Sequence, residues 1–178
     1  MIQTRLTIDD LIAIPEDGIR RELENGELIV LDSPNVDHQT ILLNVYDAAK
    51  AFLRTHRLGR VFFAPVDVML EPHNVLVPDL VFVTTERLEI VKRKIEGAPD
   101  WVVEVLSDST RKRDLHAKRD TYLKHGVRTY WAIDPESEEI RIWEDGNPAV
   151  ILERGATLSV SSLPGFELSA DEIFNLEM

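Results

Sequence analysis

The feature that most constrains the fold is a run of apolar residues of strand length, Trp101 to Leu106, that is interrupted only by Glu104. A strand as apolar as this is typical of the inner part of a sheet that other elements cover on both faces. A second run, Val77 to Val83, contains Asp79 directly after Pro78. The sequence therefore predicts a layered α/β protein in which two inner strands each contain one carboxylate.

Turn and capping signals divide the rest of the chain into short elements. A capping-box pattern predicts a helix at residues 7–14, and Asn25-Gly26 predicts the turn of a hairpin at residues 20–31. Apolar residues at spacings of three and four predict a long helix over residues 36–56. The remaining expected elements are strands at 60–70, 75–83, 101–106, 128–134, 140–144 and 150–154, and helices at 84–96, at 109–125 with Ser109 as N-cap, and from 169 onwards.

The order of these elements favours a mixed sheet with helices on its faces. After residue 35 the order is helix, strand, strand, strand, helix, strand, with one further helix inserted. The chain has 178 residues, 44% of them hydrophobic, which is enough for one domain with a substantial core. We therefore expect a single α/β domain (an α+β mixed sheet) over residues 1–178, with its core at about residues 36–135 and with an N-terminal hairpin and C-terminal strands added to it.

The chain contains no cysteine, no apolar run of membrane-spanning length and no apolar stretch of signal-peptide length near residue 1. The absence of cysteine excludes disulfides, thiolate zinc sites and cysteine nucleophiles. It also agrees with a reducing compartment. We therefore expect a soluble, cytoplasmic protein.

Charge is distributed unevenly along the chain, whose net charge is −12. An acidic protein repels nucleic acid, so this total counts against a nucleic-acid-binding function. Residues 111–128 nevertheless contain seven basic and two acidic side chains, a net of +5, whereas residues 134–178 contain eleven acidic side chains and two arginines, a net of −9. We expect the basic segment either to attract phosphate or to form an ordinary solvated helix face.

Asp79 and Glu104 are the polar residues that most need an explanation. Alternation along a strand places Asp79 on the same face as Val81, and Glu104 on the same face as Val102. Carboxylates are rarely buried without a partner, because an unpaired buried charge is very costly. One hard cation, Mg²⁺ or Mn²⁺, would explain both acids, since these ions prefer carboxylate oxygen and need only one or two carboxylates besides water. The alternative is that each acid lies at a strand end, near water or an arginine. Asp67, in another expected strand, is a further candidate near the metal.

A lysine is expected beside these carboxylates. In the helix after Glu104, the side chains of Leu115, Lys118 and Tyr122 share one face. That face is the expected core stripe, so Lys118 should point inward, where it can neutralise a carboxylate, hold a phosphate or position an attacking water. The alternative is a weak surface ion pair with Asp114, four residues earlier.

Other catalytic arrangements find little support in the sequence. The five histidines show no metal-ligand spacing, and the chain has no glycine-rich phosphate loop and no nucleophile elbow. Ser107-Asp108-Ser109 is most simply a strand-to-helix turn. His38, near the start of the long helix, is expected to be a capping or core residue rather than a catalyst.

Taken together, these residues resemble the PD-(D/E)XK nuclease superfamily and, within it, the Uma-two family of restriction-endonuclease-like proteins. Pro78-Asp79 matches the PD element, and Glu104-Val105-Leu106 lies where the E-x-K element is expected. Similar blocks are found at residues 22–27, 102–107 and 130–135. The resemblance covers about residues 7–175, and this ordered set of blocks is much more specific than a bare PD…E-x-x pattern.

The resemblance implies a restriction-endonuclease-like core and a divalent-metal site on Asp79 and Glu104. Leu106 stands at the usual lysine position. In this superfamily the lysine can migrate to the neighbouring helix, where Lys118 is the candidate. If Lys118 does not reach the site, the resemblance does not extend to catalysis.

The resemblance also implies an auxiliary acid and a homodimer. Glu27, and with less support Glu22 or Glu24, is the expected acid near the metal, and the alternative for Glu27 is a solvent-facing hairpin residue. A homodimer is expected because related nucleases act on two strands. Its candidate contacts, which could equally pack on their own domain, are Leu163, Phe166, Ile173 and Phe174.

The first functional hypothesis is a Mg²⁺- or Mn²⁺-dependent endonuclease that acts on DNA, with the metal on Asp79 and Glu104 and with Lys118 orienting water or stabilising charge. Basic residues of segment 111–128 would contact backbone phosphates. The second hypothesis is a non-catalytic binding or assembly module that keeps the nuclease fold, which the net charge and Leu106 favour. A carboxylate-pair hydrolase of another class, such as a glycosidase, ranks last because only 7% of the residues are aromatic. Binding of Mn²⁺ by the carboxylates would distinguish the enzyme from the module.

Overall fold

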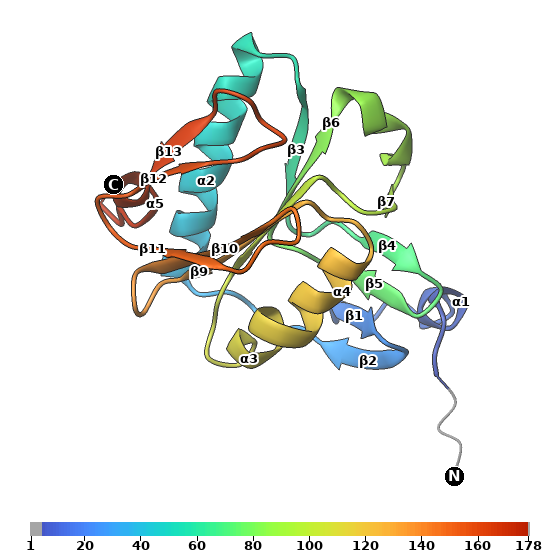
Figure 1. Ribbon diagram of the computed structural model, residues 1–178. Helices are drawn as coiled ribbons and strands as arrows, with labels where there is room; N and C mark the ends of the chain where they lie inside the picture. The colour runs from blue at the N-terminus through green and yellow to red at the C-terminus, as the bar shows by residue number, and fades with distance from the viewer. Residues whose placement is uncertain (1–4, 178) are drawn as a thin grey trace.

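The computed structural model describes residues 5–177 of the chain, and its centre is a six-stranded mixed sheet (Figure 1). In spatial order the strands are β11 (Val150–Leu152), β10 (Glu139–Glu144), β9 (Thr129–Asp134), β8 (Trp101–Val105), β6 (Leu80–Thr84) and β3 (Gly59–Phe63). β8 and β9 pair in parallel, whereas the other neighbouring pairs are antiparallel. The apolar run that contains Glu104 is therefore an inner strand, as the sequence predicts.

A second sheet of five strands contains the N-terminal hairpin. In spatial order its strands are β2 (Glu27–Val30), β1 (Arg21–Glu24), β5 (Asn74–Leu76), β4 (Val68–Glu71) and β7 (Ile95–Glu96). The predicted hairpin turn is confirmed, because Asn25 and Gly26 have φ angles of 51° and 83°. Leu23 of β1 lies opposite Val75 of β5, and this pairing joins the hairpin to the rest of the sheet.

One long helix, α2 (Val36–Thr55), covers one face of the main sheet. The side chain of Asn35 caps it by accepting a hydrogen bond from the backbone N–H of His38. Ile41 and Val45 are at most 1% exposed and pack in a core with the tryptophans of β8 and β9. The long helix predicted from apolar spacing is therefore confirmed.

A helical segment of three parts covers the opposite face. These parts are α3 (Arg111–Arg113), the π-helical turn η2 (Asp114–Lys118) and α4 (Arg119–Lys124). The N-cap residue is Thr110 rather than the predicted Ser109, whose hydroxyl lies 3.3 Å from that of Ser107 in the preceding turn. Tyr122 is completely buried and packs in a second core with Val102 of β8 and Tyr130 of β9. A π-turn is unusual within a helix and often lies at a functional site.

Prolines divide the two strands expected at 60–70 and 75–83 into four. β3 ends before Pro65, and β6 begins after Pro78. Proline has no N–H to donate to a strand ladder, so it interrupts pairing within a sheet. The chain between these prolines leaves the main sheet and supplies β4 and β5 to the second one.

Two further segments differ from the expected elements. The helix expected at 84–96 is replaced by a 3₁₀ helix, η1 (Thr85–Ile90), and the short strand β7. The strand forms because Ile95 pairs in parallel with Val68, and this tertiary pairing overrides helical propensity. Near the C-terminus, β12 (Thr157–Ser159) and β13 (Glu167–Ser169) form a small sheet that the pattern did not predict. The capping boxes that open α1 (Ile8–Ile12) and α5 (Ala170–Ile173) are confirmed.

The predicted α/β class with a mixed sheet is confirmed, but the candidate dimer contacts are wrong. Those four side chains are at most 3% exposed and belong to the core between α2 and the main sheet: Leu163, Phe166, Ile173 and Phe174. They are unavailable to a partner because β12, β13 and α5 fold back over α2. None of the helices in the described part of the chain is long and apolar enough to cross a membrane.

Candidate active site

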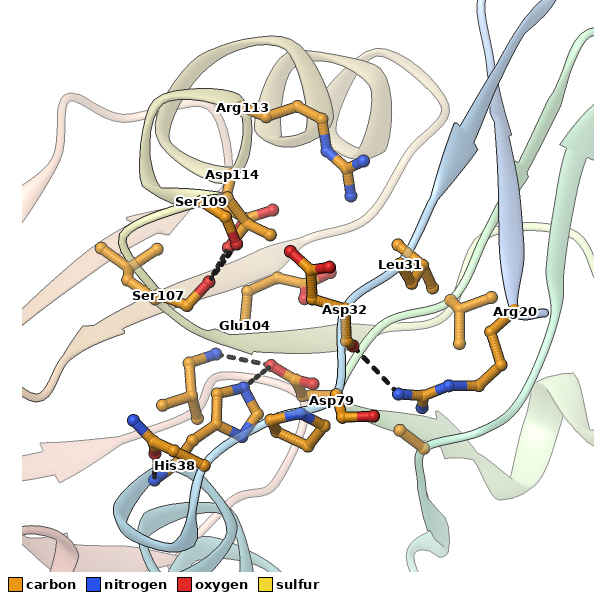
Figure 2. Close-up of a pocket in the computed structure, with 18 of the residues that line it drawn as sticks. Arg20, Leu31, Asp32, His38, Asp79, Glu104, Ser107, Ser109, Arg113 and Asp114 are labelled. Atoms are coloured by element: carbon orange, nitrogen blue, oxygen red, sulfur yellow. Dashed lines mark hydrogen bonds and ion pairs between the residues drawn. The ribbon is translucent and has the colours of Figure 1, made fainter.

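Asp79, which lies at the strand end directly before β6, is a neighbour of Glu104 in the antiparallel strand β8. Leu80 lies opposite Val103 in this pair of strands, so the residues beside them, Asp79 and Glu104, are also brought together. The Oδ2 atom of Asp79 accepts a hydrogen bond of 2.8 Å from the backbone N–H of Val105. Glu104 is 3% exposed, and the Asp79 side chain is 18% exposed. Both carboxylates border the hollow that Figure 2 shows.

Lys118 points inward from η2 toward these carboxylates. Its side chain is 3% exposed, and its Nζ atom lies 2.7 Å from Oε1 of Glu104 and 2.9 Å from Oε1 of Glu22. The predicted inward orientation is therefore confirmed. The alternative, a surface ion pair with Asp114, is wrong because Asp114 is itself buried and its Oδ1 atom lies 4.0 Å from the ammonium.

Arg113, at the end of α3, joins the helical segment to the hairpin. Its guanidinium forms an ion pair with Glu22, and its Nε atom lies 3.5 Å from Oε2 of Glu24. Glu22 is completely buried and also accepts a hydrogen bond of 2.7 Å from the backbone N–H of Val77. Glu22 therefore contacts the strand region before Asp79, the helix and the lysine at once.

We call this set of charged side chains the charge cluster. Its acidic members are Glu22, Glu24, Asp79, Glu104 and Asp114, and its basic members are Arg113 and Lys118. Five carboxylates against two cations leave an excess of three negative charges when all are ionised.

Burial and neighbouring charges shift the pKa of several members. Burial raises the pKa of the Glu104 carboxyl well above its usual value, and Asp79 adds to this rise while Lys118 opposes it. Burial alone would lower the pKa of the Lys118 ammonium, but Glu104, Glu22 and Asp114 together outweigh burial and raise that pKa. Burial also raises the pKa of Asp114. Lys118 is therefore a fixed positive charge at neutral pH and does not accept a proton.

The acidic excess fits a divalent cation. Asp79 and Glu104 offer the one or two carboxylates that Mg²⁺ or Mn²⁺ needs, and water commonly completes its coordination. Between residues 5 and 177, no three His, Asp or Glu side chains are arranged as a metal site. The residues present therefore fit an ion that is bound by two carboxylates and water, and they do not fit an ion whose ligands are all protein side chains.

His38, in the first turn of α2, contacts Asp79. Its Nε2 atom lies 3.1 Å from Oδ2 of Asp79, and the residue is 8% exposed. The sequence predicts only a capping or core histidine here, because the contact joins residues that are far apart in the chain. The first turn of α2 thus meets the strand ends at the site (Figure 2).

The cavity beside the charge cluster has a volume of about 620 Å³. Its wall includes the first turn of α2, the end of β8 and the turn from Ser107 to Thr110. Figure 2 shows that Asp32, in the segment before α2, also turns its carboxylate into this cavity. Asp32 could not be identified from the sequence, since nothing in an exposed linker segment distinguishes it from an ordinary surface acid.

The structure does not bring two other predicted acids to the site. Glu27 is exposed on β2, the edge strand, and does not line the cavity, so its predicted place near the metal is wrong. Glu22, on the next strand inward, is the buried acid beside Lys118. Asp67 lies outside the cavity wall, and its Oδ2 atom is 2.7 Å from Nζ of Lys94.

The basic segment 111–128 offers less free charge than its composition predicts. Arg111 forms an ion pair with Asp134, and Arg113 and Lys118 belong to the charge cluster. Arg119 pairs with the adjacent Asp120 and lies over the ring of Trp143. Within the described residues, its exposed basic side chains without an ion pair are Lys112, Lys124 and Arg128.

Comparison with known proteins points to nucleases. The family Uma2, described as "Putative restriction endonuclease", matches residues 8–171. No curated protein matches the chain.

A solved structure shares the fold over nearly its whole length. It is described as "a putative nuclease belonging to DUF820 from Anabaena variabilis ATCC 29413", with a TM-score of 0.84 and 22% sequence identity. The match covers 95% of this chain and 97% of that one. At this identity the likeness establishes a common fold.

Proposed function

Since the chain belongs to the Uma2 family, we propose that it is a Mg²⁺- or Mn²⁺-dependent endonuclease that hydrolyses phosphodiester bonds in DNA. The observation that supports this most is the 2.7 Å contact between Lys118 and Glu104, with Asp79 beside it, at the wall of a cavity. Two carboxylates and a lysine are the set that the family resemblance requires. The lysine comes from the helix, because Leu106 stands at the usual position.

In this proposal Asp79 and Glu104 hold the metal and Lys118 acts by its charge. A bound Mg²⁺ or Mn²⁺ supplies Lewis-acid polarisation of the phosphate and a water of lowered pKa. Because the pKa of Lys118 is raised, its ammonium donates hydrogen bonds. These stabilise negative charge on the phosphoryl oxygens and orient the attacking water. Glu22, 2.9 Å from the ammonium, keeps Lys118 in place.

The test is nicking of supercoiled plasmid DNA with Mg²⁺ or Mn²⁺ at low salt. The wild type should nick the plasmid, and Lys118→Met should abolish nicking while it preserves the fold and metal binding. Methionine keeps the side-chain volume, whereas alanine would add a cavity. Asp79→Asn and Glu104→Gln should lose both cleavage and metal binding. Equal nicking by the wild type and Lys118→Met would show that Lys118 is not the catalytic lysine or that a contaminant cleaves the DNA.

A non-catalytic binding or assembly module is the second candidate. It is favoured by the ion pairs that already satisfy Lys118, which contacts Glu22 and Glu104 at 2.9 and 2.7 Å. In such a module Lys118 would serve only to stabilise buried acids. Absence of nicking together with absence of Mn²⁺ binding would favour this module over the enzyme.

Assembly and location remain predictions. We propose a homodimer in the cytoplasm, with contacts other than the four buried C-terminal side chains. Sedimentation of a monomer at micromolar concentration would dispose of the dimer.

A further inference from the structure

Four basic side chains lie on the last turns of α2, the connection after it and the start of β3. Residues 50–60 contain no acid, and their basic side chains, here called the basic patch, are Lys50, Arg54, Arg57 and Arg60. All four are exposed. Within the described residues none of them forms an ion pair, although most other arginines of this acidic chain do.

The fold brings these side chains to one surface. Lys50 and Arg54 are separated by one turn of α2, and β3, which contains Arg60, packs against that helix. A cavity of about 470 Å³ is lined by Lys50, Arg54 and Arg60 together with Leu53. Asp47, three residues before Lys50 in the chain, and Glu86 of η1, which contacts β3, form no ion pair with the patch within the described residues. The patch is therefore a site of uncompensated positive charge.

Both elements that form the basic patch also lead to the candidate active site. Along α2, Lys50 lies twelve residues after His38, about 18 Å at the helical rise. Along β3, Arg60 lies four residues before Ala64, at most about 13 Å away. His38 and Ala64 line the active-site cavity. Figure 1 shows α2 and β3 side by side, with the turn that joins them at the end of the molecule.

We propose that the basic patch binds backbone phosphates of duplex DNA and holds the duplex along α2 and β3 toward the active-site cavity. This rests on the proposed nuclease function. Duplex DNA is the occupant that the geometry favours, because the distances from patch to cavity lie within one helical turn of DNA, about 34 Å. Arginine suits this role, since its planar donor pattern matches phosphate oxygens. The binding is sequence-independent, because phosphates carry no base information.

The test measures binding without cleavage. A fluorescent duplex of about 20 base pairs is titrated with the full chain in EDTA over a range of salt concentrations, and fluorescence anisotropy gives Kd. Each phosphate contact contributes about −0.9 to the slope of log binding constant against log salt. The double variant Lys50→Gln/Arg54→Gln should therefore weaken binding by on the order of tenfold at 0.1 M salt and reduce the slope by roughly 2.

A matched control removes two charges elsewhere. Arg5→Gln/Arg93→Gln removes the same two charges from exposed side chains that form no ion pair within the described residues and lie outside segments 50–60 and 111–128, and it should leave the slope unchanged. Equal weakening by both double variants would overturn the proposal, because a general charge effect would explain it. Tighter binding of duplex RNA or of phosphatidylserine vesicles than of duplex DNA would also overturn it.

Plasmid nicking separates this proposal from the nuclease function. If the wild type binds DNA through the patch but does not nick the plasmid, the proposed binding surface stands and the proposed nuclease activity is refuted. If the wild type nicks the plasmid and Lys50→Gln/Arg54→Gln leaves the Kd for DNA unchanged, the proposed nuclease activity stands and the proposed binding surface is refuted. Circular dichroism of both double variants checks that the fold is kept.

Discussion

The two basic segments of the chain, residues 50–60 and 111–128, look alike in composition but differ in use. In segment 111–128, Arg111, Arg113 and Lys118 form ion pairs with buried or nearly buried carboxylates. In segment 50–60 no basic side chain forms an ion pair within the described residues. In segment 111–128 these three cations therefore stabilise the fold and the site, whereas in segment 50–60 the basic side chains remain unpaired on the surface.

A basic run in a sequence can therefore have either of two roles, which are to neutralise buried acids or to present positive charge at the surface. Cations that neutralise buried acids are needed for stability, because removing one partner leaves an uncompensated buried charge. Cations on the surface contribute little to stability and remain available to attract a polyanion. Mutation of the two segments should therefore change different properties of the protein.

The largest expected effect is the loss of stability of Arg113→Ala. Its guanidinium is the ion-pair partner of Glu24 and one of two partners of Glu22. The variant leaves buried acid without a counter-charge, so the free energy of unfolding should fall by about 3 kcal/mol. Urea denaturation measures this, with Arg54→Ala as the exposed control. Equal losses in the two variants would contradict the distinction between the segments.

The next effect is stabilisation by Mn²⁺, which tests the acidic excess of the charge cluster. An ion that binds only the folded chain should add about 2.7 kcal/mol to the free energy of unfolding at one hundred times its Kd. Asp79→Asn and Glu104→Gln should remove this gain, whereas Lys50→Gln/Arg54→Gln should keep it. Equal stabilisation of the wild type and both carboxylate variants would place the ion elsewhere on the acidic surface.

Local patterns predict the parts of the site that lie within one element. Strand alternation and the PD element identify Asp79 and Glu104, and helical phase identifies the inward face of Lys118. In the same way Asn25-Gly26 predicts the hairpin turn. Each of these conclusions depends on residues a few positions apart, and the structure agrees with the geometry of each.

Contacts between distant segments could not be predicted from the same patterns. Arg113 and Glu22 are 91 residues apart, and Val77 and Glu22 are 55 apart. Their contacts depend on the pairing of β1 with β5, which no local signal specifies. The choice of Glu27 instead of Glu22 fails for this reason, since the hairpin sequence does not reveal which of its strands is the edge.

A smaller effect is expected from Asp134→Asn, which removes the partner of Arg111. Burial would raise the pKa of Asp134, but the hydrogen bonds from Arg111, Ser137 and Glu136 together with the charge of Arg111 outweigh burial and lower that pKa below its ordinary value near 3.8. A carboxylate of lowered pKa contributes stability above its ordinary pKa and loses it as pH falls through the folded-state value. Asp134→Asn should thus cost about 1.5 kcal/mol at pH 7.

The cost of Asp134→Asn should shrink as pH falls below about 3.8 and through the lowered folded-state pKa, because the wild-type carboxyl then takes up a proton, first in the unfolded and then in the folded chain. Urea denaturation at pH 7 and near pH 3 measures this, with the exposed Asp47→Asn as a control that should show no such dependence. A cost that stays constant between the two pH values would show that the Arg111 ion pair contributes nothing through its charge.

The smallest expected effect is that of Lys50→Gln/Arg54→Gln on stability. Both side chains are exposed and unpaired within the described residues, and glutamine is as good a helix former as lysine or arginine. Arg54 lies in the last turn of α2, where a positive charge interacts favourably with the helix dipole. The free energy of unfolding should therefore change by less than about 0.5 kcal/mol, and any loss should come from Arg54. Urea denaturation of the double variant and of Lys50→Gln alone measures this. A loss near that of Arg113→Ala would mean that the basic patch stabilises the fold as segment 111–128 does, and the contrast between the two segments would fail.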